Sequence, residues 1–329
     1  MTKMDEELDM SALTRRAVIA ASAIAAAAVP IRSFAAAPPA TRQAPGAYRF
    51  RLGAYQMTAI YDGLWPLKIE DNFIRNASNA EVEASLAAAF LPPGILQINF
   101  TALVVNTGHR LVLIDTGTAG QIVDSAGTLL DNLAVADIKP EAIDTILISH
   151  FHPDHINGLK DRDGRKVFPN AEIAVPEAEW AYWMNEANMT GVSPTIRKYF
   201  LNARRIFRDL ASEVTRFTPG SEVAPGITAI AAPGHTPGHV AFAVASGNQS
   251  MLVLADTARN PELFVRHPEW QPSFDMDGLV AVGSRRRLLD QAAADKMLVH
   301  GYHFPFPAIG HIAKAGTGFA LVPAMWQPL

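Results

Sequence analysis

Cysteine is absent from the 329 residues of this chain. Its absence excludes disulfide bonds, a thiolate nucleophile and cysteine-ligated metals, so metal binding falls to histidine, aspartate and glutamate. The chain also lacks a long run of lysine and arginine, and its net charge is −4. These features argue against a nucleic-acid partner. Apolar residues make up 49% of the chain and charged residues 18%, which is enough apolar content for a sizeable core.

The apolar run near the N-terminus, Ala17 to Val29, is shorter than the roughly 20 residues that a transmembrane helix needs. It follows the paired Arg15 and Arg16, and signal cleavage after Ala35 or Ala37 would fit the small residues there. This pattern is typical of a twin-arginine signal peptide. We therefore expect a signal peptide at 1–37, a Pro/Ala-rich linker at 38–47 and a mature domain at 48–329. The mature protein would be periplasmic or secreted, without a stable membrane anchor. Because the acidic Asp5-Glu6-Glu7 is unusual in a signal peptide, an ordinary membrane anchor is the alternative.

The mature region alternates patterns typical of strands and helices. A pair of strands is expected within residues 48–62, with a turn at Asp62-Gly63, and a hairpin at 100–114. Ser78 and Glu81 form a capping-box pattern for a helix through Phe90. Further strands are expected at 145–148, 172–175, 227–231, 240–244 and 251–254, and helices at 121–135, 177–189, 194–211 and 279–293.

The strongest motif is Ser149-His150-Phe151-His152-Pro153-Asp154-His155, which follows the expected strand at 145–148. Along an extended backbone His150 and His152 project to the same side, so that both can bind one cation. The chain must turn after Pro153, which directs Asp154 and His155 toward a second cation. Imidazole and carboxylate ligands together suit zinc and its neighbours in the transition series.

Further ligand-type residues follow later strands, namely His235, Asp256 and His303. Asp115-Thr116-Gly117 after an apolar run is also typical of aspartic proteases, but such an enzyme needs two facing carboxylates. The only echo is Asp256-Thr257-Ala258, and a protease would not explain the histidines. We instead expect Asp115 to orient a ligand imidazole.

Taken together, H-x-H-x-D-H, His235, Asp256 and His303 resemble the ligand set of the metallo-β-lactamase superfamily, and Asp115-Thr116-Gly117 resembles its first motif. Within that superfamily the chain is similar to the methyl parathion hydrolase branch, from Tyr48-Arg49-Phe50 to the block His303–Ile312. The block favours His303 over His300 and His311 as a ligand. The resemblance implies an α/β fold, an αββα four-layer sandwich with two mixed β-sheets, contributed by residues of about 48–210 and 211–329.

The resemblance also implies two divalent metal ions, with zinc (Zn²⁺) preferred and Co²⁺, Mn²⁺ or iron as alternatives. One ion would be held by His150, His152 and His235, and the other by Asp154, His155 and His303. Asp256 would bridge the two. Ions about 3.5–4 Å apart lower the pKa of a shared water, and the bridging hydroxide can attack an ester-type bond. Asp154 and Asp256 are the candidates for carrying the proton.

The expected substrate is a small, apolar, neutral ester: a lactone, an aryl ester or an organophosphate triester. Trp183, with Tyr199 or Phe200, resembles the aromatic pocket of the phosphotriester hydrolase. Because no tyrosine follows Asp256, Tyr302 is the candidate for a missing acid. A glyoxalase II-type thioesterase would need a basic glutathione site, for which no lysine cluster is evident. A non-hydrolytic metal-binding member is the other alternative, although His152 argues against a di-iron protein. Relatives are often dimers, so a homodimer is an expected assembly.

Overall fold

The computed structural model describes residues 39–40 and 43–329. In this part of the chain the strands form two seven-stranded β-sheets. In order across the first sheet, its strands are β1 (Ala47–Leu52), β2 (Tyr55–Lys68), β3 (Ile95–Asn106), β4 (Leu111–Ile114), β5 (Thr145–Leu147), β6 (Glu172–Pro176) and β7 (Val214–Phe217). Those of the second are β14 (Gly318–Pro323), β13 (Ile309–Ala315), β12 (Leu298–Gly301), β11 (Gln249–Ala255), β10 (Val240–Ser246), β9 (Ile227–Ala231) and β8 (Glu222–Ala224).

Both sheets are mixed. In the first sheet β1 to β4 pair antiparallel, and β4 to β7 pair parallel. In the second sheet β11 and β12 are the parallel pair among antiparallel neighbours. The changeover between the sheets lies after Phe217, a few residues later than the expected boundary at 210.

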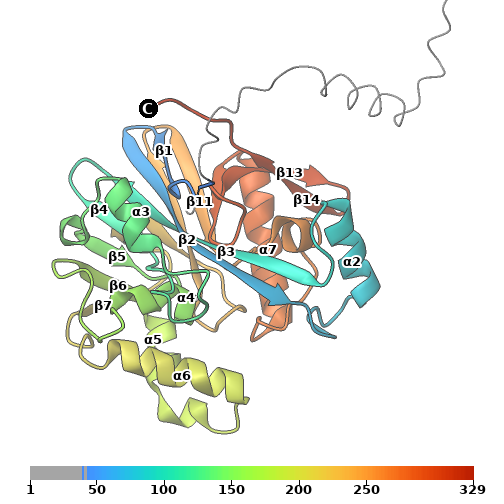
Figure 1. Ribbon diagram of the computed structural model, residues 1–329, viewed down its shortest axis with the longest axis horizontal. Helices are drawn as coiled ribbons and strands as arrows, with labels where there is room; N and C mark the ends of the chain where they lie inside the picture. Colours follow the sequence, from blue (N-terminus) through green and yellow to red (C-terminus); the bar gives the residue numbers. More distant parts are fainter. Residues whose placement is uncertain (1–38, 41–42) are drawn as a thin grey trace, which may run out of the picture. The chain divides into compact units, whose positions relative to one another are not determined.

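Helices cover the outer faces of both sheets (Figure 1). The α-helices are α2 (Asn79–Ala88), α3 (Leu129–Val135), α4 (Pro153–Ile156), α5 (Glu177–Met184), α6 (Pro194–Phe207) and α7 (Gly278–Ala294). Short 3₁₀ turns lie at Pro140–Ala142, Asn157–Leu159 and Glu186–Met189, and a π turn at Pro261–Val265. None of the helices in this part of the chain has both the length and the apolar content needed to cross a bilayer.

Alternation along β3 explains the layering. Leu103 and Val105 face the second sheet, where they join the core between the sheets. Ala102 and Val104 face the opposite way and pack in the core beneath the helices of the first sheet. Successive side chains of a strand point to opposite faces, and a strand buried on both faces is apolar throughout.

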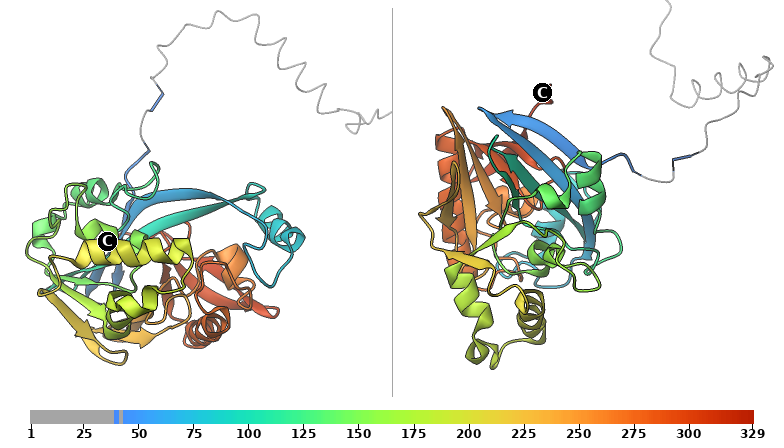
Figure 2. Two further views of the ribbon diagram at one scale, coloured as in Figure 1. Left: turned by 90° about the horizontal axis from the view of Figure 1, so that it is seen from below. Right: turned by 90° about the vertical axis from the view of Figure 1, so that its left-hand side faces the viewer.

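The second sheet is covered on its outer face by α7, through Leu288, Leu289 and Ala292. Figure 2 shows the sheets edge-on between α7, in orange-red, and the green helices of the other side. The predicted αββα sandwich with two mixed sheets is therefore confirmed. Residues 45–329 form one compact unit. The predicted signal peptide, 1–37, lies outside the described residues.

Most of the predicted elements are present, including the capping box at Ser78 and Glu81 and the antiparallel pairing of β3 with β4. The predicted turn at Asp62-Gly63 is wrong. These residues lie inside β2, where the pairing with β3 shifts register between Tyr61 and Gly63. The turn between β1 and β2 is at Gly53, whose φ of 58° suits glycine.

The predicted helix at 121–135 begins only at Leu129, and Asp62 is the reason. Its buried carboxylate accepts hydrogen bonds from the backbone N–H of Thr118 at 2.8 Å and of Leu129 at 2.9 Å. Its backbone carbonyl accepts from Gly127 at 2.7 Å and Thr128 at 3.0 Å. Residues 118–128 are therefore held as a loop against the first sheet.

His300, in β12, allows the burial of a side chain in the second sheet to be tested. Its side chain is buried, neither ring nitrogen has a hydrogen-bond partner within residues 43–329, and burial lowers its pKa to about 3. The unfolded chain binds a proton near pH 6.5, whereas the folded chain does not. Stability from this residue is therefore complete above about pH 6.5 and is lost as the pH falls toward 3.

We expect the free energy of unfolding to fall when the pH falls from about 7.5 to about 5. The fall should be about 2 kcal/mol smaller in His300→Leu than in the unsubstituted protein, because leucine takes up no proton. Urea denaturation at the two pH values measures this difference. An identical loss in both proteins would mean that folded His300 binds its proton as readily as the unfolded chain does.

Candidate metal centre

The predicted ligands lie on loops that follow strands of both sheets. His150 and His152 follow β5 of the first sheet, whereas His235, Asp256 and His303 follow β9, β11 and β12 of the second. At His152 the backbone is still extended, and Pro153 then occupies the first turn of α4. Proline is well suited to this position because it lacks the N–H that a helix start leaves unbonded. The chain therefore turns where the motif predicts.

All seven predicted residues come together, in two groups. The ligand-type atoms within each group lie within 4.8 Å of one another. One group is His150, His152, His235 and Asp256, and the other is Asp154, His155 and His303. This division matches the one that the family resemblance implies.

Asp256 lies between the two groups. Its Oδ2 is 3.1 Å from Nε2 of His235 in the first group. Its Oδ1 is 3.1 Å from Nε2 of His155 and 3.0 Å from Nε2 of His303, both in the second group. Its Oδ2 also lies 3.0 Å from Nε2 of His303, so the carboxylate contacts both groups, as a residue that is to bridge them must.

The donor atoms fit divalent cations. Nε2 of His150 and Nε2 of His152 are buried, and within the described part of the chain neither has a hydrogen-bond partner. Leaving a buried polar atom without a partner costs about 1–3 kcal/mol. A cation bound by these atoms would remove that cost, and the mixture of imidazole and carboxylate suits zinc.

The other nitrogen of several histidines is held by the protein. Nδ1 of His155 lies 2.8 Å from Oδ2 of Asp115, as predicted for a residue that orients an imidazole. Nδ1 of His303 lies 2.7 Å from the backbone carbonyl oxygen of Asn99. Such contacts fix the ring and the protonation of a metal-binding histidine.

Asp275 plays the equivalent part for His235 and was missed as a site residue. Its Oδ1 lies 2.9 Å from Nδ1 of His235, and its Oδ2 accepts a hydrogen bond from Arg285 at 2.8 Å. The sequence gave no signal that this aspartate reaches the metal centre.

The electrostatics of the cluster suit metal binding. Burial lowers the pKa of His150 and His152 well below the ordinary value, so both rings are neutral and keep a free lone pair. The pKa of Asp256 is also held well below its ordinary value. Burial alone would raise it, but the neighbouring His303 and His155 outweigh burial. Burial alone would lower the pKa of His155 and His235, but the neighbouring Asp154 and Asp256 outweigh it and raise both values. A cation bound at these two rings would take the place of their protons.

The predicted aromatic pocket is only partly present. Trp183 and Phe200 are completely buried, and the Trp183 indole donates a hydrogen bond to the buried carboxylate of Glu179 at 2.7 Å. These two side chains therefore belong to the core and do not form an accessible wall. Tyr199 is partly exposed, and its ring lies 4.8 Å from that of His152.

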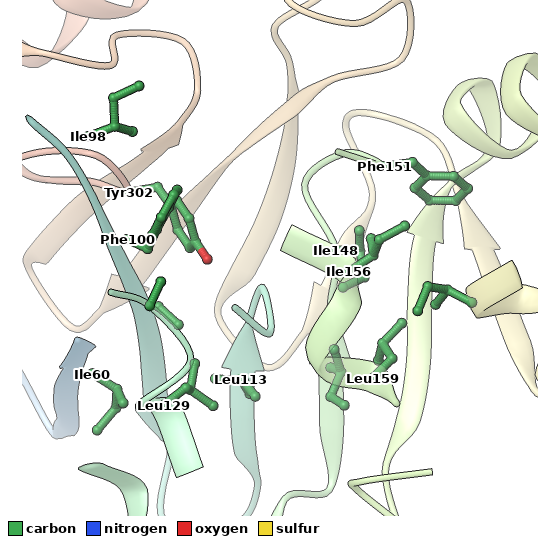
Figure 3. Close-up of a cluster of buried hydrophobic side chains, with 14 of the residues drawn as sticks. Ile60, Ile98, Phe100, Leu113, Leu129, Ile148, Phe151, Ile156, Leu159 and Tyr302 are labelled. Carbon is green, nitrogen blue, oxygen red and sulfur yellow. The ribbon is translucent and has the colours of Figure 1, made fainter. Parts of the chain in front are cut away.

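Tyr302 is not placed as a free acid. Its hydroxyl donates to the backbone carbonyl of Asp154 at 2.6 Å, and its ring lies 4.1 Å from that of His155. Only 2% of the residue is exposed. Figure 3 shows it beside Phe100 among the buried side chains. Its hydroxyl proton is already in a hydrogen bond to the backbone of the ligand loop, so Tyr302 stabilises that loop.

Arg259 is a further residue that sequence reasoning missed. It is about nine-tenths buried, and its Nε lies 3.3 Å from Oδ2 of Asp256. Its guanidinium lies 4.3 Å from the centre of the Phe274 ring. Nη1 has no hydrogen-bond partner among residues 43–329. The position of Arg259, three residues after Asp256, could have indicated a role at the site. From the sequence alone, this stretch was considered only for its lack of a tyrosine.

Aromatic side chains lie near this arginine, and of these Phe274 and Trp65 are partly exposed. Phe274 contacts Trp65, with the ring centres 6.4 Å apart, and Phe73, with the centres 5.6 Å apart. Burial raises the pKa of Tyr199, the charge of Asp154 raises it further and Arg259 opposes the rise.

Comparison with known proteins agrees with this geometry. Residues 94–303 match the model of the metallo-β-lactamase superfamily. An N-acyl homoserine lactonase of Bacillus cereus is 24% identical over 242 residues, which cover 67% of this chain and 87% of that protein.

Two solved structures are similar over most of the chain. The hydrolase AbOPH, of the β-lactamase superfamily, is 26% identical with a TM-score of 0.81, covering 87% of this chain and 100% of that one. AidC, a dizinc quorum-quenching lactonase in complex with a hexanoyl-homoserine product, is 26% identical with a TM-score of 0.80, covering 86% and 99%. By its fold, its matched region and its clustered histidines and aspartates, the chain belongs to the metallo-β-lactamase superfamily of metal-dependent hydrolases.

Proposed function

We propose that this protein is a lactonase that uses two divalent cations to hydrolyse the ring ester of N-acyl homoserine lactones. The observation that carries the proposal is the pair of ligand groups with Asp256 between them. The similarity to an N-acyl homoserine lactonase and to a dizinc lactonase supports both the substrate class and zinc as the metal.

His150, His152 and His235 would hold one cation, Asp154, His155 and His303 the other, with Asp256 shared. Two cations in such a site supply an acidified water and a Lewis acid for the ester carbonyl. The remaining work falls to the protein, which must bind the ester, exclude bulk water and move one proton.

Asp154 is better placed than Asp256 to carry that proton. The side chain of Asp154 is 14% exposed, whereas that of Asp256 is 1% exposed and lies between the two groups. A proton taken up at the accessible carboxylate can reach the departing alcohol or the solvent. Tyr302 is excluded from this role because its hydroxyl is bonded to a backbone carbonyl.

Arg259 is the proposed donor to a substrate oxygen, because Nη1 is unpartnered and the guanidinium lies next to Asp256. Tyr199 would contact the substrate from the side of His152, and Phe274 and Trp65 from the side of Arg259. A charged donor between aromatic surfaces suits an ester that carries an apolar chain and a second polar oxygen.

The proposal is tested by a hydrolysis panel on the purified mature domain with its metals counted. The panel compares an N-acyl homoserine lactone, an aryl ester, a phosphotriester and a glutathione thioester. We expect the lactone to have the highest kcat/KM. A lead for the phosphotriester would favour the methyl parathion hydrolase branch, and a lead for the thioester a glyoxalase II-type enzyme. No turnover with two cations bound would favour a non-hydrolytic member.

The ligand assignment is tested by comparing His303 with two nearby histidines. His303→Ala should lose one of two metal equivalents, and kcat/KM should fall by more than the roughly 10- to 100-fold typical of a lost outer contact. His311→Ala, at an exposed position, and His300→Ala should keep both metals. Metal analysis of the three variants measures this. Loss of metal from His311→Ala alone would show that the last motif is misaligned.

The role of Arg259 is tested by Arg259→Met, which removes the charge but keeps a flexible apolar side chain over Phe274. A hydrogen bond to a charged group contributes about 1.5–3 kcal/mol, so kcat/KM for the lactone should fall about 10- to 150-fold. Arg266→Met is the matched control, because Arg266 pairs with Glu262 on an exposed surface. Steady-state kinetics with unchanged metal content would assign the loss to substrate binding, and an unchanged kcat/KM would refute the contact.

A further inference from the structure

Glu179 is a buried carboxylate outside the ligand set. It lies in α5 and is completely buried. Its Oε2 accepts hydrogen bonds from the backbone N–H of Phe151 at 3.0 Å and from the Trp183 indole at 2.7 Å. Its Oε1 accepts from the backbone N–H of Gly238 at 2.7 Å. Burying an anion is costly unless donors surround it, and these three donors meet that need.

Two of the donors belong to the ligand loops. Phe151 lies between His150 and His152, on the loop that follows β5 of the first sheet. Gly238 lies three residues after His235, on the loop that follows β9 of the second sheet. One carboxylate therefore connects two loops from different sheets, each of which supplies ligands to the first group.

The second loop also packs directly against α5. A Cβ atom at Gly238 would lie 2.3 Å from the backbone nitrogen of Glu179, closer than any side chain tolerates. Beside this contact, the backbone N–H of Val240 donates to the carbonyl of Ser149 at 3.1 Å. The separation of the two loops is thus set at Glu179 and at one neighbouring backbone hydrogen bond.

This separation matters because the first group spans both loops. Nδ1 of His152, from the first loop, and Nε2 of His235, from the second, lie 2.9 Å apart. Both rings must face one centre for a single cation to bind them. A change in loop spacing would move one ring relative to the other.

We infer that Glu179 is a positioning residue that sets the spacing of the two ligand loops and thereby the affinity of the His150–His152–His235 group for its cation. The inference rests on the proposed metal-binding role of that group. It assigns Glu179 no contact with substrate or metal.

The test compares three variants of the zinc-loaded protein. In Glu179→Gln one acceptor oxygen becomes an NH₂ group, so at least one of the three N–H donors loses its bond. Trp183→Phe removes the indole donor and keeps both loop hydrogen bonds. Glu177→Gln is the matched control, because Glu177 is a half-exposed residue of the same helix that pairs with Arg216.

Each protein is equilibrated with Zn²⁺ and a graded series of a chelator, and bound metal is counted. For Glu179→Gln we expect the affinity for one of the two cations to fall about 10- to 100-fold, as for other contacts that orient ligands. Trp183→Phe should lower the urea midpoint with unchanged zinc affinity, and Glu177→Gln should change neither. A lower urea midpoint for Glu179→Gln with unchanged zinc affinity would make its role structural and overturn the inference.

If Glu179→Gln does not fold, Glu179→Asp serves as the second variant. It keeps the charge but is one methylene shorter, so that it cannot reach both loops, and the same selective loss of one cation is expected. Because the readout is zinc affinity, failure of the proposed lactonase activity would appear separately, as two bound cations without ester hydrolysis. An unsubstituted protein that binds no zinc would overturn both proposals.

Discussion

The site depends on how the protein holds the imidazole rings of His155, His235 and His303, in each of which one nitrogen contacts an outer oxygen atom and the other faces the shared centre. Asp115 holds His155, and Asp275 holds His235. Asp275 is held in turn by Arg285 of α7, whose Nε donates to the backbone carbonyl of Thr257. Arg285 therefore connects the helix layer behind the second sheet with the metal centre.

Local sequence was sufficient to predict the features that depend on neighbouring residues. The H-x-H-x-D-H motif follows a strand and contains a proline that fixes the turn, so both the direction of His150 and the change of direction at Asp154 can be derived from the residues themselves. The apolar residues of β3 are likewise typical of a strand buried on both faces, but the αββα layering was implied by the family resemblance. The grouping of His235 and His303 with that motif came from family resemblance, since no local rule brings distant loops together.

The residues that the sequence did not reveal act over long separations. Asp62 binds a loop more than fifty residues away. The first part of the predicted helix at 121–135 is therefore a loop, and the helix begins at Leu129. Glu179 joins loops that belong to different sheets. Trp183 was expected in a substrate pocket because it resembles an aromatic residue of the phosphotriester hydrolase pocket, yet its indole donates a hydrogen bond to buried Glu179. Asp62 and Glu179 are thus buried polar groups that form hydrogen bonds with residues distant in sequence. Neither the spacing nor the periodicity of the sequence predicts which residues those are.

The supply of ligands by both sheets has a thermodynamic consequence. A cation held by His150 and His235 would cross-link the two sheets, whose shared core is apolar. Because unfolding would separate these ligands, binding energy adds to the folding free energy, by about 2.7 kcal/mol when free metal is a hundredfold above its dissociation constant. Metal supply would then govern how long the folded protein persists as well as how fast it turns over its substrate.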